Sequence, residues 1–309
     1  MPSLVILGGT GFLGRSLLAY LNAYSTLPVK VVTRRVSSDM HLYSNRVTWH
    51  MANLFSPDAL DNILSSGDIV IHLIYIQERE VDNFKMMDSI LDACCRHQVS
   101  RFIHCSSAVV VGGTKDEFIN EKTECIPRTQ YERIKFRLEQ QVQLAVLRGL
   151  NVAILRPTAI IGLGSQNLMK LAYSLVHGNR LMNYLRASLF GKRKMHLVPV
   201  RNVCAALMYI VNQKEYSSNC IYSISSDDNP ENNFLAVEKM LLDALGLKQR
   251  KIPILRLPLV ILSLCLRLRG RSASDLRRVY ETNFAPECSL LEAINEFGQF
   301  FITAAALHN

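Results

Sequence analysis

One stretch near the N-terminus decides the fold: Leu4-Val5-Ile6-Leu7-Gly8-Gly9-Thr10-Gly11-Phe12-Leu13-Gly14. A four-residue apolar run precedes a glycine-rich turn, and an amphipathic segment over residues 13–21 follows it. In such a unit Gly8 permits a tight turn, Gly11 lets the backbone approach a pyrophosphate, and Gly14 lets the helix pack on the strand. The helix N-terminus also favours negative charge. The stretch therefore predicts a βα unit that binds a dinucleotide.

Short β-rich runs alternate with amphipathic segments through the first half of the chain, as in βαβ units around a parallel sheet. Strands are expected at 4–7, 29–33, 47–50, 68–73, 101–105 and 152–156, and helices at 13–21, 57–64, 83–96 and 129–148. After Pro157 the pattern changes to glycine-containing loops, followed by a strand at 221–225 and a helix at 233–245. We expect an α/β protein with a doubly wound parallel Rossmann sheet in residues 1–157. A smaller C-terminal substrate lobe is expected in residues 158–309, with some return to the sheet.

The composition of the 309-residue chain indicates a large globular protein. With 49% hydrophobic and 20% charged residues it can bury a sizeable core, which excludes disordered and fibrous classes. The eight cysteines form no CxxC pair and lie mostly in apolar runs, so buried thiols are expected rather than disulfides. Neither they nor the histidines form a cluster that indicates a metal site. His72 and His104 end apolar strands and are expected in the core.

The net charge of +9 is concentrated in one part of the chain. Residues 248–278 hold nine Lys and Arg against Asp275 alone, so the remainder is close to neutral. A nucleic-acid-binding surface is therefore not expected. The N-terminus runs into the first apolar strand without a basic region, which favours a cytoplasmic protein.

Residues 252–271 combine this positive charge with an uncharged run, residues 257–266, that is too short to cross a bilayer. The segment can lie in the membrane interface with its arginines on anionic head groups, a peripheral contact at the inner face of the cytoplasmic membrane. It can equally be a helix of the substrate lobe that is buried against the core. The sequence leaves both interpretations open.

Thr33-Arg34-Arg35 stands at the end of the second strand, where an NAD-specific site carries an acid for the ribose 2′-hydroxyl. Two cations favour a 2′-phosphate instead. Arg34 and Arg35 therefore predict NADP as the cofactor, with NAD as the alternative. The other interpretation is a pair of solvated arginines on a loop.

A candidate proton relay lies at the end of the fifth strand and on the helix after it. Tyr131 and Lys135 are spaced i, i+4 and so share one helix face. Ser107 ends the strand, where the carboxyl ends of parallel strands meet a ligand. A tyrosine, whose ordinary pKa is about 10, works at neutral pH only if a nearby cation lowers that pKa. We expect Lys135 to supply the cation and Ser107 to hydrogen-bond the substrate oxygen.

Together these features resemble the extended short-chain dehydrogenase/reductase family, of the NAD-dependent epimerase/dehydratase type. The likeness covers nearly the whole chain. Beyond the glycine turn and the Tyr131/Lys135 pair, it rests on Ile69-Val70-Ile71-His72-Leu73, Phe102-Ile103-His104-Cys105-Ser106-Ser107 and Leu155-Arg156-Pro157-Thr158-Ala159-Ile160-Ile161-Gly162. The resemblance implies that Ser107, Tyr131 and Lys135 are the catalytic triad.

The resemblance also implies binding residues for cofactor and substrate. Those for the cofactor are Thr10, Phe12 and Leu13 at the pyrophosphate, Asn53 and Leu54 at the adenine, Leu73 near the nicotinamide ribose, and Pro157 near the nicotinamide, together with Tyr131 and Lys135. For the substrate, Ala159 takes the place of a common asparagine, beside Ser107. Lys194, in the basic stretch Lys192-Arg193-Lys194, can clamp a substrate diphosphate or belong to a solvated turn.

Val200-Arg201-Asn202-Val203 stands where nucleotide-sugar members of the family commonly carry Val-Asp-Asp-Val. This favours the branch that acts on polysaccharide precursors. The expected function is hydride transfer at a hydroxyl or keto carbon, C4, of a nucleotide- or polyprenyl-linked hexose diphosphate in cell-envelope polysaccharide synthesis, by a reductase or an epimerase. Two alternatives remain: a dehydrogenase of a steroid or other lipid alcohol, and an NADP(H)-binding interaction protein without turnover. A homodimer is compatible with the sequence.

Overall fold

The computed structural model describes residues 2–35, 46–116, 118–191, 193–213, 219–249, 278–279 and 288–306. The chain divides into two compact units. The larger comprises Met1–Gly112, Cys125–Pro157 and Cys204–Tyr222, and the smaller comprises Gly113–Glu124, Thr158–Val203 and Ser223–Asn309.

A seven-stranded sheet forms the larger unit. Its strands are β1 (Leu4–Leu7), β2 (Val29–Thr33), β3 (Val47–Met51), β4 (Ile69–His72), β5 (Arg101–Cys105), β7 (Val152–Pro157) and β10 (Cys220–Ile224). They lie in the order β3-β2-β1-β4-β5-β7-β10, and the pairings from β3 through β7 are parallel. The order reverses between β1 and β4, where ligands bind in open α/β sheets. The predicted doubly wound Rossmann fold is confirmed.

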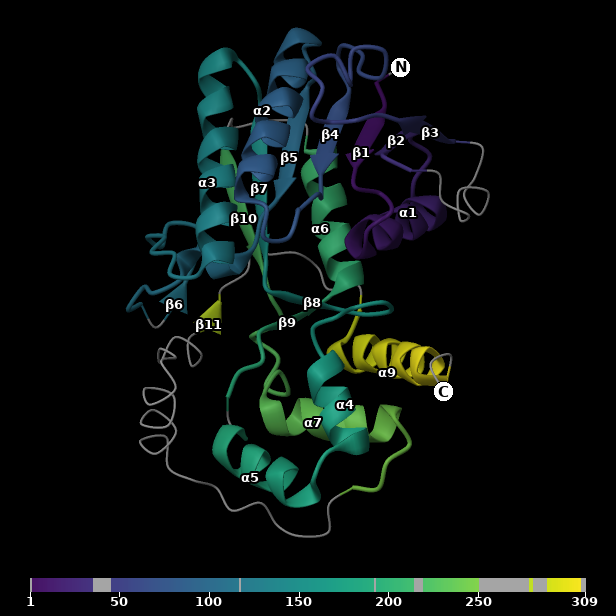
Figure 1. Ribbon diagram of the computed structural model, residues 1–309, viewed down its shortest axis with the longest axis vertical. Helices are drawn as coiled ribbons and strands as arrows, with labels where there is room; N and C mark the ends of the chain where they lie inside the picture. The colour runs from purple at the N-terminus through teal and green to yellow at the C-terminus, as the bar shows by residue number, and fades with distance from the viewer. Residues whose placement is uncertain are drawn as a thin grey trace. The chain divides into compact units, whose positions relative to one another are not determined.

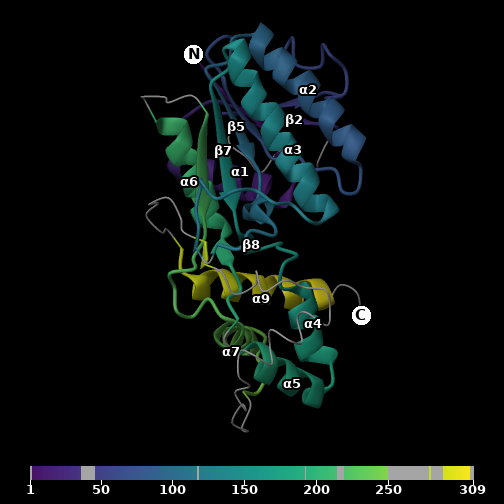
Figure 2. The ribbon, with the colours of Figure 1, turned by 90° about the vertical axis from the view of Figure 1, so that its left-hand side faces the viewer.

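Helices cover both faces of this sheet. Helices α2 (Glu80–Arg96) and α3 (Gln130–Leu144) lie side by side on one face, and α1 (Phe12–Tyr24) and α6 (Val200–Asn212) cover the other (Figures 1 and 2). Short 3₁₀ turns, η2 (Ala108–Val111) and η3 (Ala145–Arg148), follow β5 and α3. The core under α2 and α3 is apolar, with Val5, Val70, Met87, Phe102, Ile134 and Ile154 fully buried.

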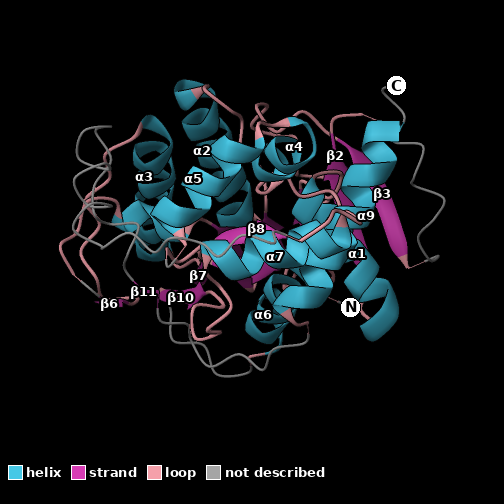
Figure 3. Ribbon diagram, turned by 90° about the horizontal axis from the view of Figure 1, so that it is seen from below, coloured by secondary structure: helices cyan, strands magenta, loops and turns pink. Residues whose placement is uncertain are grey.

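The smaller unit is mainly helical (Figure 3). It contains α4 (Met169–His177), α5 (Arg180–Phe190), α7 (Phe234–Ala244) and α9 (Leu290–Ala306). Two parallel pairs of short strands complete it, β8 (Ala159–Ile161) with β9 (Leu197–Pro199), and β6 (Phe118–Ile119) with β11 (Arg278–Val279). Its own core includes Ile161, Leu197, Val237, Leu241, Ile294 and Phe297.

Two of the expected elements are wrong. The helix predicted over residues 57–64 is a run of turns, whose backbone hydrogen bonds mostly join residues three apart. These turns already bury Leu60, Ile63 and Leu64, so the apolar spacing is satisfied without a regular helix. Of the glycine-containing loops expected after Pro157, Gly162 and Gly164 lie in turns as expected, whereas Gly178 and Gly191 are the residues at which helices α4 and α5 end.

The strand expected at 221–225 is β10, which lies beside β7 at the edge of the main sheet. Residues 252–271 lie outside the described residues. Within the described part of the chain, no helix is both long enough and apolar enough to cross a bilayer.

Candidate active site and cofactor cleft

The glycine turn joins β1 to α1. Gly8 has a φ of +96°, a conformation that L side chains rarely adopt. A Cβ on Gly14 would lie 2.2 Å from the Gly8 carbonyl oxygen, so only glycine lets α1 approach the turn this closely. Gly11 is the N-cap of α1, and no side chain caps the helix start. The partial positive charge of the helix N-terminus is thus left for a ligand.

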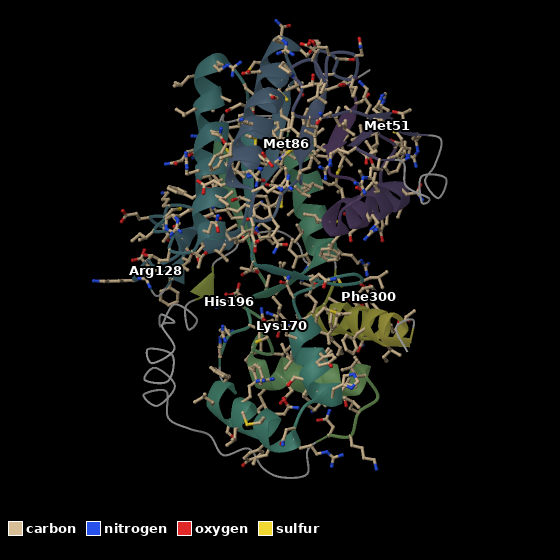
Figure 4. The ribbon with its side chains drawn as sticks, in the orientation of Figure 1. Met51, Met86, Arg128, Lys170, His196 and Phe300 are labelled. Atoms are coloured by element: carbon tan, nitrogen blue, oxygen red, sulfur yellow. The ribbon has the colours of Figure 1, made fainter. Side chains whose placement is uncertain are left out.

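A cavity of about 420 Å³ opens above this turn. It lies at the carboxyl ends of β1, β2 and β4, and Met86 of α2 also lines it (Figure 4). Seven of the predicted cofactor residues line it: Gly8, Thr10, Gly11, Arg34, Arg35, Leu54 and Leu73. The cavity is also lined by seven residues that were not predicted to bind the cofactor: Val32, Thr33, Phe55, Ile74, Tyr75, Ile76 and Met86.

The chemistry of this cleft fits a dinucleotide. The uncapped helix start favours phosphate, and the apolar side chains of Leu54, Phe55 and Met86 suit a base. Arg34 and Arg35 follow β2 and are exposed, while the Thr33 hydroxyl donates to the Arg35 carbonyl oxygen (3.0 Å) and turns the chain there.

Other residues expected at the cofactor do not line this cavity. Asn53 is exposed, and its Oδ1 accepts a hydrogen bond from the Phe55 amide (3.4 Å). Phe12 and Leu13, like Gly14, lie in the first turn of α1, and Pro157 is buried at the end of β7. The cofactor contacts implied for these residues stay predictions.

The structure brings Ser107, Tyr131 and Lys135 together in the larger unit. A capping box starts α3, with Thr129 Oγ1 accepting from the Glu132 amide and Glu132 Oε2 accepting from the Thr129 amide (both 3.2 Å). This box fixes the first helical turn, which carries Tyr131. A side-chain hydrogen bond joins Tyr131 to Ser107. One turn further on, Lys135 is buried and its Nζ donates to the Cys105 carbonyl oxygen (3.1 Å).

Tyr75 connects this group to the cofactor cleft. Its ring lines the cavity, meets the Tyr131 ring edge-on with centroids 5.0 Å apart, and lies 5.2 Å from Lys135 Nζ. Tyr75 was not predicted from the sequence. The available signal was its place three residues after the end of β4, at a carboxyl end of the parallel sheet.

The electrostatics of the pair differ from the expectation. Burial raises the pKa of Tyr131 to about 12, and the hydrogen bond from Ser107 opposes this rise only in part. The predicted lowering by Lys135 does not occur in the structure, where the Lys135 ammonium donates to the Cys105 carbonyl oxygen. Burial also lowers the pKa of Lys135. Tyr131 is therefore a protonated phenol at neutral pH, the form that donates a proton.

Two buried polar pairs lie close to the relay. His72 and His104, on neighbouring strands, approach each other through Nδ1 atoms 3.0 Å apart. Burial lowers the pKa of His72 to about 3 and that of His104 well below its ordinary value, so both are neutral. Arg156 of β7 binds Glu139 of α3, four residues after Lys135.

Two residues expected at the substrate, Ala159 and Lys194, lie in the smaller unit and make separate hydrogen bonds there. The Ala159 amide donates to the His196 carbonyl oxygen (2.8 Å). The Lys194 ammonium donates a hydrogen bond to the Asp227 carbonyl oxygen (2.7 Å), so part of its donor capacity is engaged within the protein.

The same region holds a pair that the sequence analysis missed. His196 (Figure 4) has a φ of +51°, and its Nδ1 lies 2.7 Å from Oδ2 of Asp227, whose side chain is 1% exposed. Left-handed backbone in a non-glycine residue is uncommon and concentrates at functional sites. No sequence signal joined two residues 31 positions apart.

Comparison with known proteins agrees with this geometry. The sequence model of the NAD dependent epimerase/dehydratase family matches residues 4–225. The chain is 25% identical to the decarboxylating sterol-4-alpha-carboxylate 3-dehydrogenase of Saccharomyces cerevisiae over 188 residues, covering 55% of this chain and 54% of that protein. The chain spans about half the length of several curated relatives that it matches.

Two solved structures share the fold. UDP-glucuronic acid 4-epimerase from Bacillus cereus, in complex with NAD, superposes with a TM-score of 0.73 at 14% identity, over 98% of each chain. RMD from Pseudomonas aeruginosa, complexed with NADPH, superposes with a TM-score of 0.64 at 19% identity, over 98% of this chain and 100% of that one. With its family match over most of the sequence and its Rossmann sheet, the chain belongs to the NAD-dependent epimerase/dehydratase family, the extended short-chain dehydrogenases/reductases.

Proposed function

We propose that this NAD(P)-dependent oxidoreductase acts on a hydroxyl or keto carbon, C4, of a nucleotide- or polyprenyl-linked hexose diphosphate, as a reductase or an epimerase. The observation that carries the proposal is the Ser107-Tyr131-Lys135 group, which reaches the cofactor cleft through the Tyr75 ring. A protein that only binds a dinucleotide has no need of a phenol and a buried ammonium on one helix face. This favours catalysis over the binding-only alternative.

The residues divide the work of a reversible proton and hydride transfer. A nicotinamide bound in the cleft would supply or accept the hydride. In reduction, Tyr131 gives its hydroxyl proton to the oxygen of the keto carbon, and Ser107 donates a hydrogen bond to the same oxygen. The Lys135 ammonium has two donors besides the one that it gives to the Cys105 carbonyl oxygen, and with cofactor and substrate bound it would stabilise the resulting phenolate. Oxidation reverses these steps, and an epimerase performs both on one substrate.

NADP is the cofactor that we propose. Arg34 and Arg35 line the cleft at the end of β2, where the ribose 2′ substituent is recognised in Rossmann folds. A guanidinium pairs with phosphate oxygens, whereas the ribose hydroxyl of NAD needs an acceptor.

Positive charge in the smaller unit favours a substrate that carries a diphosphate. Lys194 carries three donors, and the Asp227 and Asn229 carbonyl oxygens accept from its ammonium at 2.7 and 3.5 Å. A phosphate oxygen can take another. Synthesis of a cell-envelope polysaccharide precursor is the role that such a substrate implies, and this chemistry is in keeping with a cytoplasmic enzyme.

A steroid or other lipid alcohol is the second candidate substrate. The sequence likeness to a sterol dehydrogenase favours it, although that likeness covers about half of each protein. The catalytic steps would be the same, because both substrates present a secondary alcohol to Tyr131. The two candidate substrates differ in one requirement: the enzyme must bind the anionic diphosphate of the hexose substrate, whereas a steroid or other lipid alcohol needs no such contact.

A turnover screen tests the proposal. The full chain is incubated with NADPH or NADP and with UDP-hexoses, polyprenyl-diphosphate hexoses or sterols, and products are identified by mass spectrometry. We expect turnover of a diphosphate-linked hexose that is lost in Tyr131→Phe and kept in Tyr24→Phe, a matched change at an exposed tyrosine. Turnover of the sterols alone would select the second candidate, and cofactor binding with no turnover of any class would contradict both.

A further inference from the structure

The outward faces of helices α4 and α5 in the smaller unit carry large apolar side chains. Tyr173 and Val176 of α4 are 63% and 40% exposed, and Leu181, Met182 and Leu185 of α5 are 64%, 58% and 49% exposed. We call these five residues the hairpin face. Several large apolar side chains exposed on one short hairpin favour an interaction site.

Polar groups, rather than these apolar ones, join the two helices. The Ser174 hydroxyl donates to Asn183 Oδ1 (2.7 Å), and Asn183 Nδ2 donates back to the Ser174 carbonyl oxygen (2.6 Å). Arg186 Nη1 also donates to the Ser174 hydroxyl (2.8 Å). Asn179 caps α5 through the Leu181 amide (2.8 Å), which fixes the connection between the helices. The hairpin is thus held from within and leaves its apolar side chains outside.

The stretch of sequence that contains the hairpin carries charge of a single sign. Between Glu139 and Glu215 the sequence contains no Asp or Glu, whereas it contains ten Lys and Arg: Arg148, Arg156, Lys170, Arg180, Arg186, Lys192, Arg193, Lys194, Arg201 and Lys214. Lys170 at the start of α4 (Figure 4) and Arg180 at the start of α5 are exposed. The apolar side chains are therefore accompanied by cations that no acid in the hairpin can neutralise.

We propose that the hairpin face docks on an anionic lipid bilayer. Apolar side chains that enter the head-group boundary beside lysines and arginines are the pattern of interfacial binding. Tyrosine suits this depth because its ring is apolar and its hydroxyl polar. With 9 and 11 residues, the helices are too short to cross the bilayer and lie at its surface.

The charge selects the membrane over other occupants. Two copies of this chain would place equal positive charge face to face, which disfavours a dimer through this surface. Residues 248–278 of the same chain carry nine cations against one acid, so they are not complementary to it either. The docking goes beyond the proposed function, because it requires neither a sugar nor a sterol substrate.

Vesicle cosedimentation of the full chain tests the docking. We expect binding to vesicles of phosphatidylglycerol and phosphatidylcholine, little binding to phosphatidylcholine alone, and a decrease with salt. Leu181→Ser/Met182→Ser and Lys170→Gln/Arg180→Gln should each lower the bound-to-free ratio at least tenfold. These side chains are exposed, so the thermal unfolding midpoint should stay unchanged.

A matched control is available in the larger unit. Leu144 and Leu147 are 62% and 84% exposed, and the nearby Arg148 is paired with Asp92 (2.5 Å). Leu144→Ser/Leu147→Ser should bind vesicles like the unchanged protein.

Four results would overturn the docking. The first is a protein that stays in the supernatant with anionic vesicles at low salt, and the second is an equal loss of binding in the control variant. The third is vesicle binding that survives both hairpin variants but is lost in Arg267→Gln/Arg269→Gln/Arg271→Gln. The fourth is a dimer, detected by light scattering, that dissociates in the Leu181→Ser/Met182→Ser variant. The third would assign the contact to residues 252–271, and the fourth would assign the face to a second copy.

Discussion

Arg156 on β7 and Glu139 on α3 form a buried bidentate ion pair. Arg156 Nη2 lies 2.6 Å from Glu139 Oε2, Nε lies 3.0 Å from Oε1, and the two side chains are 4% and 1% exposed. Because Glu139 is one turn beyond Lys135, the pair anchors the helix that carries the relay to the sheet beneath it. A charge in this position is stabilising only while its partner is present.

Glu139→Gln should therefore destabilise the protein more than removal of both charges does. The single change leaves the Arg156 guanidinium buried and uncompensated, at a cost of about 3–5 kcal/mol in the free energy of unfolding. Glu139→Leu/Arg156→Leu should cost less, and the two unfolding curves in urea provide the comparison. A double variant less stable than the single one would contradict this role of the pair.

The proton relay gives a second expectation. Tyr131→Phe should lower turnover by a factor of about 100 or more, the usual effect of a lost general acid, and Ser107→Ala should lower it less. Cofactor affinity, measured by fluorescence titration, should change little in either variant. Unchanged turnover in Tyr131→Phe would remove this residue from the mechanism.

The parts of the molecule that the sequence predicted are those specified by neighbouring residues. The glycine turn, the strands of the sheet and the i, i+4 placement of Tyr131 and Lys135 depend on local spacing, and the structure contains them. The run at 57–64 has helical spacing but buries its apolar residues with turns alone. The spacing of apolar residues alone therefore did not distinguish a regular helix from a run of turns.

The parts that the sequence did not predict depend on contacts between distant segments. Tyr75 lies over Lys135, and His196 pairs with Asp227, through tertiary packing that no local pattern encodes. The pKa of Tyr131 illustrates the same point. The direction of its shift was misjudged because burial of the phenol, rather than the spacing to Lys135, has the largest effect on this pKa.

The buried histidine pair should make the protein sensitive to acid. Burial lowers the pKa of His72 from 6.5 to about 3, so the unfolded chain binds a proton between these values that the folded chain does not. Stability is then complete above pH 6.5 and falls as the pH falls, by up to about 1.4 kcal/mol per pH unit for one histidine. Urea unfolding at several pH values measures this slope.

Two variants test the origin of that slope. His72→Leu/His104→Leu should lose less stability on acidification than the unchanged protein, because neither side chain takes up a proton. His177→Gln alters an exposed histidine and should leave the slope as it is. Equal slopes in all three proteins would assign the acid sensitivity to other groups.

Arg34 and Arg35 should set the choice of cofactor. Both line the cleft at the end of β2, and a guanidinium paired with a 2′-phosphate forms charge-assisted hydrogen bonds worth about 1.5–3 kcal/mol. Arg34→Asp and Arg35→Asp should each weaken NADP binding about tenfold to a hundredfold, because the aspartate repels the phosphate. The aspartate can also accept a hydrogen bond from the ribose hydroxyl, so NAD binding should strengthen.

Lys85→Asp on α2 makes the same change of charge at an exposed residue that does not line the cleft, and it should leave the ratio of the two affinities unaltered. Calorimetry measures both affinities. Equal binding of NAD and NADP by the unchanged protein would show that the two arginines are solvated and do not select between the cofactors.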